Sequence, residues 1–222
     1  MKRAKFGVIF DMDGVLVLSG DAHWESWRAV AADRGVTLTH ELFLSTFGQV
    51  NEDCIAVMFG SQTEAEEVER IADEKERAYR DIVRANVPLA PGLFELLAQL
   101  QEAGAAIAVG SSAPPENVDL VLDAGGLREF ISVSVNGKQV AQGKPAPDVF
   151  LIAAEQLGLT PDRCIVVEDA PVGVQAARAA GMRAVAVTTT NTAKDLEEAG
   201  AHHIAADLQA LQLANLIGPD LL

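Results

Sequence analysis

The spacing of hydrophobic positions changes twice along the chain, near residue 18 and near residue 88. The opening run Phe6–Phe10 is continuously apolar, which is typical of a strand buried on both faces of a sheet. Between about residues 20 and 87, apolar residues recur at helical spacing and no segment resembles a strand. From Pro88 onward, short apolar runs alternate with helical segments, which predicts a parallel sheet covered on both faces.

The middle segment is expected to contain four helices, at 21–34, 39–47, 52–59 and from about 64 to 84. Asn51 is placed to cap the third, and the sequence SQTE at 61–64 has the pattern of a capping box for the fourth. The last segment predicts strands at 105–110, 130–135, 164–167 and 184–187, with a weaker one at 204–206. Asn136-Gly137 is typical of a hairpin turn after the second of these strands.

The simplest architecture that fits this pattern is an α/β fold with a Rossmann-like parallel-sheet core and an all-helical cap. The core is discontinuous and comprises residues 1–17 and 88–222, because the first strand needs the later ones to be buried. Residues 18–87 form the helical cap domain, which is inserted after the first strand.

Composition narrows the classes of partner. The 222 residues include 17 basic and 32 acidic ones, a net charge of −15 that disfavours nucleic acid or an anionic membrane as a partner. No apolar stretch reaches the length of a membrane span. The two cysteines, Cys54 and Cys164, lie in apolar segments and predict buried free thiols in a reducing compartment. We therefore expect a cytoplasmic protein, and a monomer.

Polar residues follow three of the predicted strands and occupy one loop between them. They are Asp11 and Asp13 after the first strand, Ser111 and Ser112 after 105–110, Lys144 before the helix at 147–157, and Glu168 and Asp169 after 164–167. Taken singly, each has an ordinary explanation as a turn residue, a helix cap or a solvated loop residue. In open α/β sheets, however, ligands bind beyond the carboxyl ends of the strands, so their shared placement favours a site.

This set of side chains suits phosphoryl transfer, which needs a nucleophile, neutralising charge, donors to the phosphoryl oxygens and an acid/base. Asp11 can act as the nucleophile and form an aspartyl phosphate, while Asp13 can protonate the leaving oxygen. Ser111 and Lys144 can bind the phosphoryl oxygens. Asp11 and Asp169 can supply carboxylates to Mg²⁺, which prefers oxygen ligands.

Four motifs stand in the order expected for one large family. They are DMDGVL at 11–16, VGSS at 109–112, GKPAPD at 143–148 and VEDAPVG at 167–173. With these motifs the chain resembles the haloacid dehalogenase (HAD) superfamily, in the phosphatase and β-phosphoglucomutase-like branch with a helical cap. The resemblance covers nearly the whole core and, more loosely, the cap.

The resemblance implies a role for each motif residue. Asp11 is the nucleophile and a metal ligand, Asp13 is the acid/base and a metal ligand through its main-chain carbonyl, Ser111, Ser112 and Lys144 bind phosphate, and Glu168 and Asp169 hold Mg²⁺. Relatives that cleave carbon–halogen bonds or phosphonates lack an acid at the place of Asp13, so its presence favours phosphate esters.

The phosphatase and phosphomutase hypotheses are harder to separate from the sequence. In β-phosphoglucomutase, a Lys and an Arg flank a Gly in the cap segment that faces the substrate. The corresponding segment here reads FGQVN at 47–51, with Phe47 and Asn51 at the places of those cations. No Lys or Arg occurs between Gly35 and Gly60, which weakens the mutase hypothesis.

The cap offers four candidate contacts for the substrate. Gln49 and Asn51 can hydrogen-bond hydroxyl groups, Phe47 can form a wall, and His23 matches a helix histidine that mutases use. Leu18 departs from the family pattern, since many relatives carry an Asp at this hinge position.

Three functional hypotheses remain. The first is a Mg²⁺-dependent phosphatase that hydrolyses a small phosphorylated metabolite, such as a sugar phosphate, through an aspartyl phosphate. The second is a β-phosphoglucomutase-like sugar phosphomutase. The third, from another class, is a binding protein for phosphorylated metabolites without useful turnover.

Overall fold

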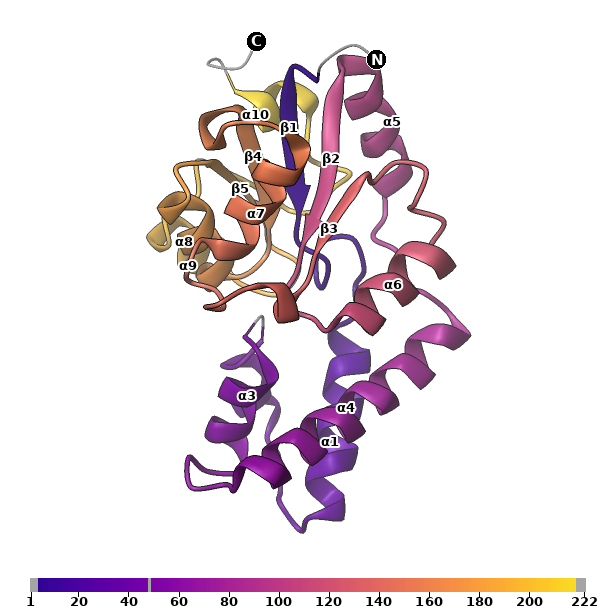
Figure 1. Ribbon diagram of the computed structural model, residues 1–222, viewed down its shortest axis with the longest axis vertical. Helices are drawn as coiled ribbons and strands as arrows, with labels where there is room; N and C mark the ends of the chain where they lie inside the picture. Colours follow the sequence, from indigo (N-terminus) through magenta and orange to yellow (C-terminus); the bar gives the residue numbers. More distant parts are fainter. Residues whose placement is uncertain (1–3, 48, 219–222) are drawn as a thin grey trace.

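The structure is a computed structural model that describes residues 4–47 and 49–218. A parallel six-stranded sheet carries helices on both faces, and a group of four further helices lies at the end of the sheet toward which the strand arrows point (Figure 1). The predicted α/β fold with a Rossmann-like parallel-sheet core is confirmed.

The first strand lies at the centre of the sheet. The strands are β1 (Phe6–Phe10), β2 (Ala105–Gly110), β3 (Val133–Val135), β4 (Cys164–Glu168), β5 (Arg183–Val187) and β6 (His203–Ala205). Their order is β3-β2-β1-β4-β5-β6, and every neighbouring pair is parallel. Because β2 and β4 both pair with β1, the carboxyl ends of these three strands meet at one edge.

Helices of the later segment cover both faces of the sheet. One face packs against α5 (Leu93–Ala103), α6 (Pro115–Ala124) and α10 (Leu213–Ile217), and the other against α7 (Asp148–Leu157), α8 (Pro171–Ala179) and α9 (Ala193–Glu198). Two short 3₁₀ helices, η1 (Gly137–Gln139) and η2 (Pro161–Arg163), lie in the connections before α7 and β4.

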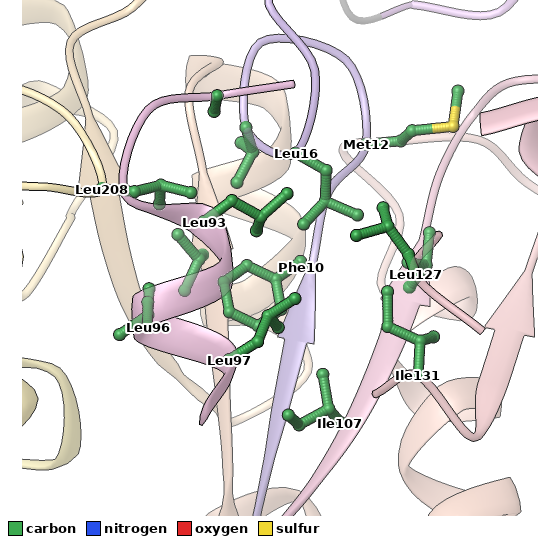
Figure 2. Close-up of a cluster of buried hydrophobic side chains, with 14 of the residues drawn as sticks. Phe10, Met12, Leu16, Leu93, Leu96, Leu97, Ile107, Leu127, Ile131 and Leu208 are labelled. Atoms are coloured by element: carbon green, nitrogen blue, oxygen red, sulfur yellow. The ribbon is translucent and has the colours of Figure 1, made fainter. Parts of the chain in front are cut away.

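The continuous apolar run of β1 is explained by burial on both faces. Val8 and Phe10 belong to the hydrophobic cluster on the α5 face, whereas Ile9 between them belongs to the cluster beneath α7 and α8. Figure 2 shows Phe10 among Leu97 of α5 and Ile107 of β2. Successive strand residues point to opposite faces, so a strand covered on both sides needs apolar residues at every position.

The four helices between β1 and α5 have a hydrophobic core of their own. They are α1 (Gly20–Asp33), α2 (His40–Leu44), α3 (Asn51–Met58) and α4 (Ala65–Ala85). Trp27, Phe43, Ile55 and Ile71 form part of a buried cluster separate from the two sheet clusters. This separation is consistent with a cap of residues 18–87, although the domain boundaries themselves stay a prediction.

Main-chain hydrogen bonds hold the two crossings between the sheet and these helices together. The N–H of Leu18 donates to the carbonyl of Pro88 at 2.7 Å, and the N–H of Ala90 donates to Leu16 at 2.9 Å. The side chain of Leu18 is exposed. The hinge is therefore bonded through the backbone at a position where many relatives place an Asp.

Two expected helix caps are wrong. The SQTE sequence does not form a capping box, because α4 begins after Glu64, whose side chain caps nothing. Asn51 is the first residue of α3 rather than its cap, and its amide donates instead to Glu76 at 2.9 Å. A tertiary hydrogen bond has here replaced the local one that the sequence suggests.

The predicted hairpin is also wrong. Asn136 caps η1, with its side chain accepting from the N–H of Lys138 at 3.1 Å. Because β3 is parallel to β2 and β4 lies beyond β1, the chain must cross over after β3 instead of turning back. The strand expected at 130–135 is correspondingly short, at Val133–Val135.

Cys54 and Cys164 are both buried and free, as expected. Within the part of the chain that the structure describes, no helix combines the length and the apolar character needed to cross a membrane.

Candidate active site

The carboxyl ends of three neighbouring strands place the first site residues. Asp11 follows β1 directly, and its N–H donates to the carbonyl of Val167 in β4 at 2.9 Å. Ser111 follows β2, and its N–H donates to the carbonyl of Val135 in β3 at 3.0 Å. Ladder hydrogen bonds thus continue one residue past the strands and fix the backbone from which both side chains extend.

A buried ammonium group joins two of the strand ends. Lys144 Nζ donates to Asp11 Oδ1 at 2.8 Å and to Glu168 Oε1 at 2.6 Å. Glu168 Oε2 accepts from the N–H groups of Asp169 (2.9 Å) and Ala170 (3.0 Å), just before α8. Burial alone would lower the pKa of Lys144, but the charges of Asp11 and Glu168 raise it above its usual value.

Three buried carboxylates surround one small volume. One oxygen from each of Asp11, Glu168 and Asp169 lies within 4.8 Å of the others. The hydroxyl of Thr190 donates to Asp169 Oδ2, and Asn191 Nδ2 donates to the Asp169 carbonyl at 3.0 Å.

These carboxylates fit a divalent cation. Burial raises the pKa of Asp11 to about 7, against the opposing effect of Lys144. Burial and the neighbouring Glu168 and Asp11 raise the pKa of Asp169 well above its ordinary value. Three acids thus share one ammonium, and a hard divalent cation would offset the remaining charge through oxygen ligands of the kind that it prefers.

Asp13 has a different environment, because its partners come from the helices between β1 and α5. Its Oδ1 accepts from the hydroxyls of Ser19 and Tyr79 (3.0 Å) and lies 3.0 Å from His23 Nε2. Burial alone would raise the pKa of Asp13, but His23, Ser19 and Lys75 together lower it to about 2. The surroundings of the two motif acids therefore shift their pKa values in opposite directions, although the acids lie two residues apart.

Motif glycines make room for these acids. A Cβ at Gly173 in α8 would lie 1.7 Å from Glu168 Oε1. A Cβ at Gly14, whose φ is +79°, would lie 1.9 Å from Asp169 Oδ2. A side chain at either position would displace a carboxylate of the acidic cluster.

We expect Gly173→Ala to lower the free energy of unfolding by about 1–3 kcal/mol, because the added methyl group overlaps Glu168 in a packed site. Alanine would otherwise be favoured over glycine in a helix. Thermal unfolding measures the effect, and Gly20→Ala is the control, since nothing lies within 4 Å of a Cβ there. Equal melting temperatures for the two variants would contradict this account of Gly173.

A small cavity of about 60 Å³ lies between the strand ends and the cap helices. The residues that line it are Asp11, Asp13, Ser111, Ser112, Ala113 and Pro114 from the core side, and His23, Trp27, Phe43, Thr46, Phe47, Gln49, Asn51, Cys54, Lys75 and Glu76 from the segment between β1 and α5. All four cap candidates of the sequence analysis therefore reach this cavity. Gly48, between Phe47 and Gln49, lies outside the described residues.

The predicted site residues divide into two groups in space. Asp11, Asp13, Ser111 and Ser112 face the cavity, whereas Lys144, Glu168 and Asp169 lie behind Asp11 and do not line it. This placement is compatible with the predicted roles, which stay predictions.

Sequence reasoning missed two charged residues in the cavity wall. Lys75 and Glu76 of α4 are 2% and 6% exposed, and Lys75 Nζ lies 2.9 Å from His23 Nδ1 and 2.7 Å from Glu76 Oε1. The sequence signal that could have found Lys75 is its helical spacing from apolar residues. Ile71, Lys75 and Tyr79 recur every four residues, so Lys75 lies on the apolar, inward face of the helix.

Lys75 also bears on the choice between phosphatase and phosphomutase. The segment at 47–51 carries no cation, but a different helix brings an ammonium group into the same cavity. Asn117 of α6 is a further missed residue, completely buried, whose side-chain amide donates to Glu76 Oε2.

Comparison with known proteins identifies the class. The family model described as haloacid dehalogenase-like hydrolase matches residues 8–187. The chain therefore belongs to the haloacid dehalogenase-like hydrolases, and the predicted resemblance is confirmed.

Individual relatives indicate which members of this family the chain resembles. A phosphorylated carbohydrates phosphatase of Thermotoga maritima is 31% identical over 200 residues, covering 87% of this chain and 91% of the relative. A fructose-1-phosphate phosphatase of Escherichia coli is 32% identical over 181 residues, covering 82% and 95%. The crystal structure of a β-phosphoglucomutase from Clostridium difficile has a TM-score of 0.85 at 25% identity and covers 93% of both chains. The expected enzyme class, a HAD-type phosphoric monoester hydrolase, agrees with the two phosphatases.

Proposed function

We propose that this chain is a Mg²⁺-dependent phosphatase that hydrolyses the phosphate ester of a small metabolite, such as a sugar phosphate, through an aspartyl phosphate at Asp11. The observation that carries the proposal is the position of Asp11. Its carboxylate faces the cavity beside Asp13 and is bonded on its other side to Lys144, next to Glu168 and Asp169.

In the first step, a carboxylate oxygen of Asp11 attacks the phosphorus atom and the ester P–O bond breaks. Asp13 gives its proton to the leaving alkoxide, so the product is a neutral alcohol. Ser111 is arranged to bind a phosphoryl oxygen, because its hydroxyl oxygen accepts from the N–H of Ala113 at 3.1 Å and keeps its own proton to donate.

In the second step, Asp13 removes a proton from a water molecule that attacks the phosphorus atom. The bond between phosphorus and Asp11 breaks, which releases inorganic phosphate and restores the carboxylate. A bound phosphoryl dianion close to Asp13 raises the pKa of that carboxyl, which favours the protonated form required in the first step.

Asp11, Glu168, Asp169 and the main-chain carbonyl of Asp13 are the groups that would hold Mg²⁺. When bound, the ion supplies positive charge that offsets the charge of the phosphoryl group and of the buried carboxylates. Lys144 shares this task, since it remains protonated between Asp11 and Glu168.

The substrate class rests on the cavity and on the relatives. Trp27, Phe43 and Phe47 form an apolar wall, while Gln49 and Asn51 offer amides to hydroxyl groups. The two phosphatases similar to this chain carry phosphorylated carbohydrates and fructose 1-phosphate in their names. A cytoplasmic location and a monomeric state remain our predictions.

Lys75 keeps the phosphomutase as a second candidate, since a mutase needs a cation for a distal phosphate, but Glu76 pairs with this ammonium at 2.7 Å. Product analysis separates the two reactions. With a hexose 1-phosphate, the phosphatase yields free sugar and phosphate, whereas the mutase yields the 6-phosphate isomer.

A screen of phosphorylated metabolites for phosphate release tests the proposal. We expect release from small monophosphates with Mg²⁺, loss of activity with a chelator, and a rate about 10²–10⁴-fold lower for Asp13→Asn, which removes the acid/base. Steady turnover of p-nitrophenyl phosphate that depends on Asp13 would exclude the binding-protein hypothesis. Binding of sugar phosphates without any release of phosphate would support it instead.

A further inference from the structure

Two oppositely charged neighbours in α4 face the cavity from the cap side. Lys75 and Glu76 are both buried, and both line the cavity that Asp11 and Asp13 line from the sheet side. Their side chains meet at 2.7 Å. Burying an ion pair is unfavourable unless it is well hydrogen-bonded, so the two charges at this place call for an explanation.

Lys75 is close to the acid/base. Its Nζ lies 2.9 Å from His23 Nδ1, and Nε2 of the same ring lies 3.0 Å from Asp13 Oδ1. The ammonium is thus two contacts beyond the group that protonates the leaving oxygen. It lies where the remainder of the substrate must be bound, and an uncompensated charge there would attract an anionic group.

Glu76 is held in place by donors from three helices. Oε1 accepts from Lys75 of α4 and from Asn51 of α3, and Oε2 accepts from Asn117 of α6. Arg80 fixes Asn117 in turn, by donating to its Oδ1 at 3.0 Å. Burial would raise the pKa of Glu76, but Lys75 and His23 lower it below its usual value, so the carboxylate is ionised.

The cap side of the cavity therefore carries no net charge from this pair. The other residues on that side, apart from the ring of His23, are uncharged: Trp27, Phe43, Thr46, Phe47, Gln49, Asn51 and Cys54. A second phosphate would meet one ammonium that is already neutralised and one carboxylate that repels it, in surroundings of low dielectric constant.

We propose that Glu76 is a specificity-determining residue that restricts the site to monophosphate esters with an uncharged remainder, because it neutralises Lys75. This inference rests on the proposed phosphatase function and adds a charge rule to it. The carboxylate acts on substrate choice through Lys75 and through its own repulsion of anions, without taking part in proton transfer.

The test compares fructose 1-phosphate with fructose 1,6-bisphosphate, which differ by one distal phosphate. We expect the wild type to have the higher kcat/KM for the monophosphate. Glu76→Gln should raise the relative kcat/KM for the bisphosphate by about tenfold or more, since it removes one negative charge and frees Lys75. Lys75→Gln should shift the ratio in the opposite direction, and the double variant should return it toward the wild-type value.

Glu74→Gln is the matched control. It makes the same change two residues away, at a carboxylate that pairs with Arg34 and does not line the cavity, so the ratio should not change. Thermal unfolding checks that each variant is folded. If Glu76→Gln does not fold, the single Lys75 variant and the neutral double variant still decide, because their expected ratios differ.

Calorimetry on the Asp11→Asn background separates this inference from the proposed function. Suppose that the wild type releases no phosphate, but the Asp11→Asn variant binds the monophosphate more tightly than the bisphosphate. This result would overturn the proposed phosphatase function and support the charge rule. The inference is overturned if the wild type does not prefer the monophosphate, or if the Glu76 and Lys75 variants shift the ratio in the same direction.

Discussion

Replacing Asp11 with Asn is expected to reduce phosphate release by at least about 10⁴-fold, the size of effect seen when a catalytic nucleophile is removed. An amide oxygen is too weak a nucleophile to form the phosphoryl enzyme, so neither half of the reaction can proceed. Asn has nearly the same shape and can still accept the hydrogen bond from Lys144 that now measures 2.8 Å. Steady-state release of phosphate measures the effect, and retained turnover would contradict the mechanism.

The same variant should remain folded. Burial raises the pKa of Asp11 in the folded chain to about 7, against 3.8 in the unfolded chain, because burial disfavours the charged form. Ionisation between these values lowers the stability of the metal-free fold as pH rises. Asn has no such charge, so its melting temperature at pH 7 in a chelator should be no lower than that of the wild type.

Replacing Lys144 with Met is expected to destabilise the metal-free protein by about 3–5 kcal/mol, as found when one partner of a buried ion pair is removed. The ammonium contacts both Asp11 and Glu168, and its side chain is 2% exposed. Without it, the three carboxylates of Asp11, Glu168 and Asp169 have no counter-charge among their described neighbours. A divalent cation would then contribute more to the stability of the variant than to that of the wild type. The loss of stability caused by Lys144→Met should therefore be smaller in Mg²⁺ than in the chelator.

Thermal unfolding with and without Mg²⁺ measures this difference, and it does not depend on activity. Lys138→Met is the control, because Lys138 is an exposed lysine in η1, and its effect should be small under both conditions. An equal loss for Lys144→Met with and without Mg²⁺ would argue against a cation at the acidic cluster.

The core side of the site was predictable because strand geometry and sheet topology determine where the residues at the strand ends lie. An apolar run such as Phe6–Phe10 specifies a buried strand, and a parallel sheet brings the residues that follow its strands to one edge. Asp11 and Ser111 follow β1 and β2 directly, and Glu168 is the last residue of β4, so all three lie at the carboxyl edge of the sheet. The motif glycines agree with this, since Gly173 leaves space for a carboxylate.

The cap side was less predictable, because its contacts depend on how helices pack rather than on where strands end. Lys75 and Glu76 look like ordinary members of a charged helix, and only the position of Lys75 on the apolar face hints at burial. Asn51 was expected to serve its own helix, but it bonds to Glu76 of another one. The turn residues Asn136 and Gly137 were misinterpreted because a local preference cannot show on which side the next strand joins the sheet.

The carboxylates of Asp11 and Asp13 are held by different parts of the fold. Ser19, His23 and Tyr79, which hold this carboxylate, all come from the helical segment, whereas Asp11 is held by the sheet and by Lys144. If Asp11 and Asp13 act as we propose, the sheet determines where the phosphoryl group is received, and the helical segment determines the surroundings of the proton donor. Under the proposed mechanism, substitutions in the helical segment are expected to change the pH response and the choice of alcohol, while the groups that surround Asp11 stay unchanged.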